Sequence, residues 1–149
     1  MIRNRFAFTQ ALMLLGFLLA ACGQASVEAV AEQPAVVEEI EGTELARITL
    51  TEKAATRLDI QTASVAEERV NGENRLVIPH GAVLWDSSGA AWAYTSPEEL
   101  VFVRASITID HIDGDLAVLS DGPEPGTLVV TVGVAELWGT ETGVGGGGH

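Results

Sequence analysis

Hydrophobic residues divide the chain into three regions with different patterns. Residues 6–21 form one uncharged run rich in leucine, alanine and phenylalanine, whereas residues 23–44 contain many acidic residues and no sustained apolar period. From about residue 45 onward, short apolar runs alternate with polar turns that contain glycine, proline, asparagine and aspartate. Such punctuation is typical of short β-strands joined by tight turns. The pattern therefore predicts a mainly β domain that follows an acidic segment.

The beginning of the predicted domain combines two strands with a short helix. Residues 47–50 are predicted to form the first strand, and residues 51–58 a helix. Thr51 suits the N-cap because its hydroxyl can accept a backbone N–H, and Glu52 suits the first turn because the helix dipole favours a negative charge there. Residues 60–65 alternate in the manner of a second strand.

The rest of the domain is predicted to contain strands and turns only. Residues 67–74 are polar and contain Gly72, which predicts a loop. Hairpin turns are predicted at residues 86–89 and 113–115, and a rigid proline-containing turn at residues 121–126. The strands expected around these turns cover residues 76–78, 82–85, 91–94, 100–104, 107–109, 116–119 and 127–132. Together they favour a small antiparallel β-barrel or roll with one short helix.

The first residues have the features of a bacterial secretory signal. Arg3 and Arg5 precede the uncharged run, which has 16 residues and is shorter than the roughly 20 that a spanning helix needs. The run ends in Leu-Ala-Ala-Cys at residues 19–22, which resembles the lipobox of bacterial lipoproteins. The resemblance implies that residues 1–21 are a cleaved signal peptide and that Cys22 receives a diacylglycerol. The protein would then be extracytoplasmic and lipid-anchored to the inner or the outer membrane.

The charge of the chain excludes some partners, and its distribution predicts a tether. The formal net charge is −13, and loss of residues 1–21 would remove two arginines and no acid, which gives −15. A surface of this charge repels nucleic acids and anionic lipid headgroups. Residues 22–44 carry six glutamates and no basic or aromatic residue, which predicts an acidic flexible tether. The predicted β domain covers residues 45–140, and residues 141–149 are predicted to form a glycine-rich flexible tail.

Signals of catalysis are weak throughout the chain. After lipidation no cysteine nucleophile remains, and no glycine-rich phosphate loop precedes a helix. Asp110, Asp113, Asp115 and Asp121 lie close in sequence, but the further ligands of an EF-hand are missing, so a hairpin turn is favoured over a calcium site. We therefore expect a protein that is not an enzyme, with no catalytic residue and no cofactor.

Histidines and one tryptophan are the remaining candidates for a site. His80, His111 and His149 stand alone in predicted turns or in the tail, whereas a metal site needs several converging ligands. We therefore expect no metal site. Trp138 follows the last predicted strand and is the candidate for an exposed contact with a partner protein.

The order of motifs along the domain resembles that of a known family of transport proteins. Residues 77–83 match a Val-Pro-x-x-Ala-Val pattern, and residues 86–94 match an Asp-Gly-x-x-Trp-Val-Tyr hairpin. Further matches follow at residues 102–107, 120–130 and 133–137, and residues 48–63 fit the family's mature N-terminal stretch. In this order they resemble the membrane-proximal region of periplasmic adaptor proteins, also called membrane fusion proteins, of resistance-nodulation-division efflux pumps.

The chain departs from that family because it lacks the long middle part. In the family, half-lipoyl segments, an α-helical hairpin and a β-barrel domain separate the two matching ends. Here only ten residues lie between Val65 and Leu76, and no heptad run exists. The family builds its membrane-proximal domain from both ends of the chain, so the resemblance implies that one closed β domain is left.

The resemblance implies a non-catalytic accessory lipoprotein of an efflux system. It would contact the extracytoplasmic face of a resistance-nodulation-division-type permease, and it would not bridge to an outer-membrane channel because the bridging parts are missing. Two alternatives stay open. One is an extracytoplasmic lipoprotein that binds a small ligand or a metal, and the other is a degenerate adaptor with no retained activity.

Overall fold

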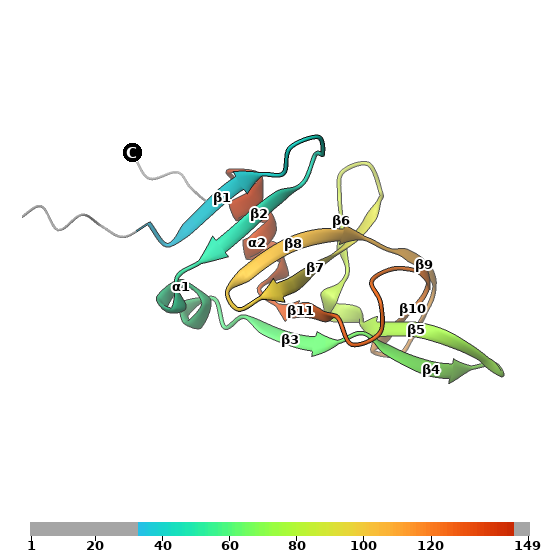
Figure 1. Cartoon of the computed structure of the whole chain (residues 1–149). Coiled ribbons are helices and arrows are strands. Elements are labelled where there is room, and N and C mark those ends of the chain that lie inside the picture. The colour runs from blue at the N-terminus through green and yellow to red at the C-terminus, as the bar shows by residue number, and fades with distance from the viewer. Residues whose placement is uncertain (1–32, 145–149) are drawn as a thin grey trace, which may run out of the picture. The chain divides into compact units, whose positions relative to one another are not determined.

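Two antiparallel β-sheets and short helices make up residues 33–144, the part of the chain that the computed structural model describes (Figure 1). This confirms the mainly β, antiparallel class. The predicted signal peptide, Cys22 and His149 lie outside the described residues. Within residues 33–144, none of the helices has the length and apolar content that a membrane span requires.

The larger sheet has seven strands. They are β1 (Ala35–Glu39), β2 (Ala46–Leu50), β3 (Gln61–Ser64), β6 (Leu84–Trp85), β7 (Ala91–Glu98), β8 (Val101–Ser106) and β11 (Leu128–Val132). Their hydrogen-bonded order is β1-β2-β8-β7-β11-β3, and β6 pairs with β7. Because β2 pairs with β8 and β3 pairs with β11, this sheet joins the beginning of the domain to its end.

The smaller sheet has four strands in the order β4-β5-β10-β9, namely β4 (Ala66–Val70), β5 (Glu73–Pro79), β9 (Thr108–Asp113) and β10 (Leu116–Asp121). Helix α1 (Glu52–Arg57) connects β2 to β3, a 3-10 turn, η1 (His80–Ala82), follows β5, and helix α2 (Val134–Glu141) follows β11. The predicted hairpin turn at residues 113–115 is confirmed, because β9 and β10 pair across it.

Two of the four passages of the chain between the two sheets consist of a single residue. Val65 links β3 to β4 and Ile107 links β8 to β9, and both are buried. The Val65 N–H donates to the Thr127 carbonyl at 2.8 Å, and the Ile107 N–H donates to the Ala91 carbonyl at 3.1 Å. The ladders are interrupted at these points, so the strands separate into two sheets. Of the predicted barrel or roll, a closed barrel is not found within residues 33–144, because no pairing joins the outer strands β1 and β3.

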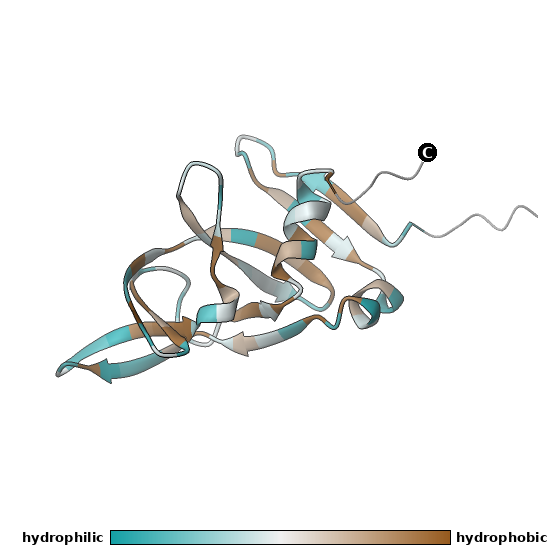
Figure 2. Cartoon of the chain, turned by 180° about the vertical axis from the view of Figure 1, so that it is seen from behind, coloured by the Kyte–Doolittle hydropathy of each residue, from teal (hydrophilic) through white to brown (hydrophobic). Residues whose placement is uncertain are grey.

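Strands β7 and β11 carry two hydrophobic clusters on opposite faces of the larger sheet. Ala93 and Val129 pack with residues of the smaller sheet, whereas their neighbours Tyr94 and Val130 pack with residues of α1 and α2. Successive residues of a strand point to opposite faces, so both faces of these strands are covered. Figure 2 shows hydrophobic residues concentrated in the central strands and hydrophilic residues in the β4–β5 hairpin. The hydrophobic core therefore consists of two clusters, one on each face of β7 and β11.

Helix α1 confirms the prediction from the sequence. It begins after Thr51, whose hydroxyl oxygen accepts the Ala54 N–H at 3.2 Å, and Glu52 lies in its first turn. Ala54 is the buried residue of the helix and packs against the cluster that contains Tyr94. A helix of this length is too short to form alone. The cap, the charge and the packing of Ala54 therefore stabilise it together.

The predicted loop at residues 67–74 is wrong, because these residues form the β4–β5 hairpin. Val70 pairs with Glu73, and Asn71 and Gly72 form a two-residue turn with φ values of 53° and 89°. Positive φ at both central residues matches the twist of the flanking strands, and Asn-Gly is the sequence pair that favours it. The hairpin was missed because residues 67–74 are mostly exposed and polar, so apolar alternation is weak there.

The predicted tether over residues 22–44 extends too far towards the domain. Residues 35–39 form β1, which pairs with β2 in antiparallel register from Ala35 opposite Leu50 to Glu39 opposite Ala46. Residues 22–32 lie outside the described residues. Val36 and Val37 favour a strand, but the glutamates around them mask that preference in the composition. The ordered domain therefore begins before residue 45.

The prediction of a single helix is also wrong, because residues 134–141 form α2. This helix follows Gly133, which has a φ of 91°. Leu137 is its fully buried residue and packs against the cluster that contains Tyr94. The helix includes the first residue of the predicted tail, Glu141, and its contacts build the site described next.

Candidate functional site

The candidate site is built around Arg104, a charged residue that is only 9% exposed. It lies on β8, two residues after the buried Phe102. Side chains two positions apart on a strand share a face, so β8 directs Arg104 to the face that α2 covers. A buried guanidinium is costly unless it is paired and hydrogen-bonded.

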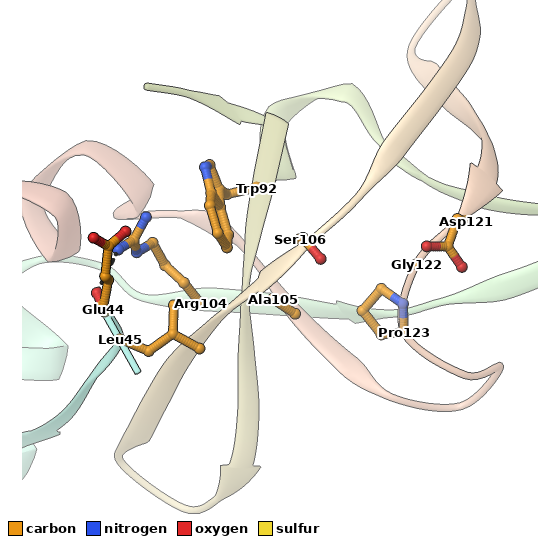
Figure 3. Close-up of a pocket in the computed structure, with 9 residues that line it drawn as sticks. All are labelled: Glu44, Leu45, Trp92, Arg104, Ala105, Ser106, Asp121, Gly122 and Pro123. Carbon is orange, nitrogen blue, oxygen red and sulfur yellow. Dashed lines mark hydrogen bonds between the residues drawn. The ribbon is translucent and has the colours of Figure 1, made fainter. Parts of the chain in front are cut away.

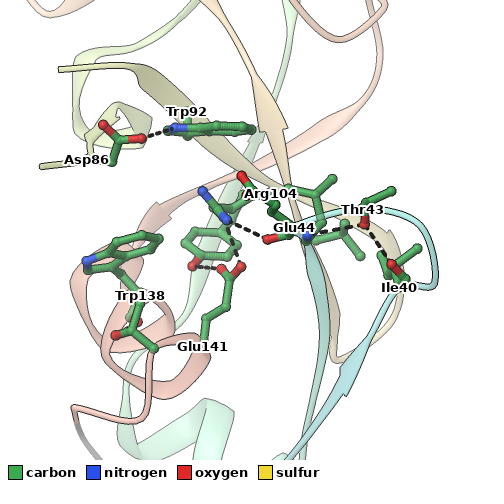
Figure 4. Close-up of polar contacts among 12 residues, drawn as sticks. Ile40, Thr43, Glu44, Asp86, Trp92, Arg104, Trp138 and Glu141 are labelled. Carbon is green, nitrogen blue, oxygen red and sulfur yellow. Dashed lines mark hydrogen bonds and ion pairs between the residues drawn. The ribbon is translucent and has the colours of Figure 1, made fainter. Parts of the chain in front are cut away.

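Arg104 is held by an ion pair and by a backbone carbonyl (Figure 4). Its Nε donates to Oε1 of Glu141 at 2.9 Å, and its Nη2 donates to the carbonyl of Glu44 at 3.1 Å. The Glu141 side chain is 6% exposed, and its second oxygen accepts a hydrogen bond from the Tyr94 hydroxyl. The cluster therefore joins β7, β8, α2 and the loop between β1 and β2.

Two tryptophans flank the guanidinium of Arg104. The central carbon of the guanidinium lies 4.4 Å from the ring centre of Trp92 and 5.0 Å from that of Trp138. Both distances allow cation–π attraction. Trp138, predicted to be an exposed partner contact, lies on α2, is half-buried and packs on Arg104. Its contact with a partner protein stays a prediction.

The Tyr94 hydroxyl is fixed as a donor by its surroundings. Burial raises the pKa of the Tyr94 phenol, and the hydrogen bond to Glu141 together with that carboxylate's charge raises it further. The phenol is therefore protonated across the pH range in which the protein folds. It cannot act as a general base, and its role in the cluster is to orient Glu141.

Asp86 orients the ring of Trp92. Its Oδ1 accepts the Ser88 N–H at 2.8 Å, the Ser88 hydroxyl at 2.6 Å and the Ala90 N–H at 3.0 Å. Its Oδ2 accepts the indole N–H of Trp92 at 2.9 Å. The hydrogen bond from the Ser88 hydroxyl, and then that from Trp92, lower the pKa of Asp86 from 3.8 to about 2.

We expect the Trp92 indole N–H resonance to shift with a midpoint near pH 2 when the full chain is titrated with acid. The pKa of Asp86 is lower in the folded state, so the carboxylate stabilises the fold above pH 3.8, and this contribution is lost as the pH falls through about 2. In Asp86→Asn, which has no charge to lose, this step should disappear. A midpoint near 3.8 in the unmodified protein would contradict the assignment.

Two open grooves adjoin Arg104. The larger, here called the Trp92 groove, has a volume of about 630 Å³ and its lining includes Glu44, Trp92, Arg104, Ser106, Asp121 and Pro123 (Figure 3). The second has a volume of about 440 Å³ and includes Trp138 and Glu141 in its lining. Both are surface grooves with carboxylates at their edges, which suits binding more than enclosed chemistry.

The candidate metal ligands do not form a metal centre in the described part of the chain. His80 is exposed in η1, and Nδ1 of His111 lies 2.9 Å from a carboxylate oxygen of Asp110, its neighbour in sequence. Within residues 33–144, no group of three or more His, Cys, Asp or Glu side chains could hold a metal ion. Asp113 and Asp115 are exposed at the β9–β10 turn.

The prediction from the sequence missed Arg104, Glu141 and Tyr94. One signal for Arg104 was present, because it shares strand parity with Phe102 in an otherwise apolar run. No local signal pairs it with Glu141, which lies 37 residues away in a helix that was not predicted. Comparison with known proteins adds no further assignment: no family model, curated protein or solved structure matches this chain.

Proposed function

We propose that this protein is a lipid-anchored, non-catalytic accessory component of a membrane efflux system. It would contact the extracytoplasmic face of a transporter subunit, of the resistance-nodulation-division type that the motif order suggests. The lipobox-like sequence that ends in Cys22 supports the anchor. The ordered motifs from about residue 45 to residue 137 support the relation to adaptors.

The observation that carries the proposal is the pairing, within the larger sheet, of strands from the beginning and the end of the domain. Strands β2 and β3 come from the first folded segment and pair with β8 and β11, which come from the second half of the domain. The membrane-proximal domain of adaptors is likewise built from both ends of its chain. A two-residue turn at Asn71 and Gly72 stands between the two halves, at the place where adaptors carry their long middle part. A roll-like domain of this kind needs no inserted part to complete it.

Binding fits this geometry better than chemistry does. Arg104, Tyr94 and Glu141 satisfy one another in a packed cluster, and the grooves beside them are open. Trp85 is 56% exposed, which leaves an aromatic side chain on the surface for a contact with another protein. A protein that is held at the membrane by a lipid needs only modest affinity, because the anchor raises its local concentration near a membrane partner.

Affinity capture tests the proposal. The tagged full chain is cross-linked in cells of its own host, recovered from detergent-solubilised membranes, and its partners are identified by mass spectrometry. We expect the recovered partners to include a polytopic efflux-transporter subunit, enriched at least about tenfold over Cys22→Ser, which loses the lipid anchor.

The Cys22→Ser variant is the matched control because it changes one atom outside the described domain. It should leave the membrane fraction and should no longer incorporate labelled fatty acid. If the unmodified protein recovers no transporter subunit although it is lipidated, the proposed function is wrong. If Cys22→Ser still incorporates fatty acid, the anchor assignment is wrong.

A further inference from the structure

We propose that the Trp92 groove is a docking site for an extended, positively charged polypeptide segment of the partner. This inference rests on the proposed function for the identity of the partner, a transporter subunit. It deepens that function, because it names the surface that binds and the chemistry of the segment it binds. Three properties of the groove support it.

The first property is an unused hydrogen-bond donor of Arg104. Nε and Nη2 have partners, whereas Nη1 has none among residues 33–144. No buried side-chain nitrogen or oxygen in that range lacks a partner, so Nη1 must reach the surface. Figure 4 shows this end of the guanidinium turned towards the two tryptophans and away from Glu141 and Glu44. A side chain that is nine-tenths buried and lines the Trp92 groove therefore keeps one N–H without a partner in the described part of the chain.

The second property is the charge of the groove. Glu141 already neutralises Arg104, so the charges that a ligand meets are the carboxylates of Glu44 and Asp121. Both residues are exposed, and neither makes an ion pair within the described part of the chain. A cationic side chain can approach them without displacing a partner, whereas an anionic ligand would be repelled.

The third property is the spacing of these groups. Figure 3 shows Glu44 and Asp121 towards opposite ends of the groove, with the guanidinium of Arg104 beside Glu44 and with Trp92 and Ser106 between the two ends. An extended segment can place basic side chains at both ends and a backbone carbonyl at Nη1, near the Glu44 end. The indole of Trp92 provides an apolar surface along the path, which suits the apolar side chains of an alternating sequence.

The test uses an acetylated and amidated peptide of alternating lysine and valine, added to the full chain in detergent micelles. Matched peptides carry glutamate or serine in place of every lysine. We expect the lysine peptide to bind at least about tenfold more tightly than the glutamate peptide, with weaker binding at high salt. We also expect it to shift the side-chain nitrogen resonances of Arg104.

Variants of the groove locate the binding. Asp121→Asn and Glu44→Gln keep the fold and the Glu44 carbonyl, and each should weaken binding about threefold, as loss of one exposed ion pair predicts. Asp113→Asn removes an equally exposed carboxylate at the β9–β10 turn and should leave the affinity unchanged. The inference is overturned if no lysine peptide binds, or if all three variants weaken binding equally.

The outcome is separable from that of the proposed function. If the peptide binds in the groove but capture recovers no transporter subunit, the docking site stands and the partner is of another kind. If a transporter subunit is captured equally well by the unmodified protein and by the Asp121→Asn, Glu44→Gln double variant, the proposed function stands and this docking site is wrong.

Discussion

Replacement of Arg104 by methionine is expected to lower the free energy of unfolding by about 3–5 kcal/mol, because it leaves a buried charge without its partner. Methionine keeps the length and the apolar character of the arginine stem, but it cannot pair with Glu141, whose side chain is 6% exposed. The stacking of Trp92 and Trp138 on the guanidinium is lost as well. Urea unfolding of the full chain, followed by tryptophan fluorescence, measures the loss.

A second substitution separates the charge from the packing. Glu141→Gln removes the carboxylate charge and keeps an oxygen that can accept the Tyr94 hydroxyl. Combined with Arg104→Met, it should recover about 2 kcal/mol or more of the loss, because no unpaired charge is then buried. If the double variant is no more stable than Arg104→Met alone, the loss comes from packing and the ion-pair explanation fails.

Replacement of Gly133 by alanine is expected to lower the free energy of unfolding by about 2–4 kcal/mol, from backbone strain and overpacking together. Gly133 has a φ of 91°, and a Cβ added there would lie 2.2 Å from Cδ1 of Ile60. Either the start of α2 or the side chain of Ile60 would have to move. Because Leu137 and Glu141 are both on α2, the effect should spread to the Arg104 cluster. Thermal unfolding of the full chain measures it.

Gly89 provides a matched control for the Gly133→Ala experiment. Its φ of 85° is similar, but nothing lies within 4 Å of an added Cβ, so Gly89→Ala should cost only the backbone term of about 1–2 kcal/mol. The double variant Gly133→Ala, Ile60→Val removes the clashing methyl group and should fall between the two. Equal losses for Gly133→Ala and Gly89→Ala would show that the contact with Ile60 contributes nothing.

These predictions assign the stability of the candidate site to α2. The helix is positioned at its start by Gly133 and at its end by Glu141, and it brings Trp138 onto Arg104. The Trp92 groove lies beside the same guanidinium. A substitution that displaces α2 should therefore change the groove as well as the stability, whereas Asp121→Asn should change the groove alone.

Local chemistry explains which elements could be predicted. The Thr51 cap of α1 and the turn at residues 113–115 depend on residues within a few positions of one another, and both are found where the sequence places them. The same kind of signal was present at Asn71-Gly72, where a two-residue hairpin turn forms. It was outweighed by the polar composition of the flanking strands, which is a property of exposed strands as much as of loops.

Pairing between segments that are distant in sequence explains the other differences between the predicted and the observed fold. β1 is a strand because β2 offers it a hydrogen-bonding edge, and the acidic composition of the segment gives no sign of that edge. The strands form two sheets because β3 and β4 are separated by Val65, and β8 and β9 by Ile107. Both residues are buried in the core, and no local sequence pattern specifies this.

The sequence by itself determined the mainly β class, the first helix with its cap, two of the hairpin turns and the lipobox-like segment that motivates the proposed anchor. Only the tertiary structure decided the separation into two sheets, the second helix and the burial of Arg104 between Trp92 and Trp138. The physical reason is the distance along the sequence between the residues that interact. Caps and turns depend on neighbours along the chain, whereas a buried ion pair such as Arg104–Glu141 depends on two segments that meet only after the sheet has formed.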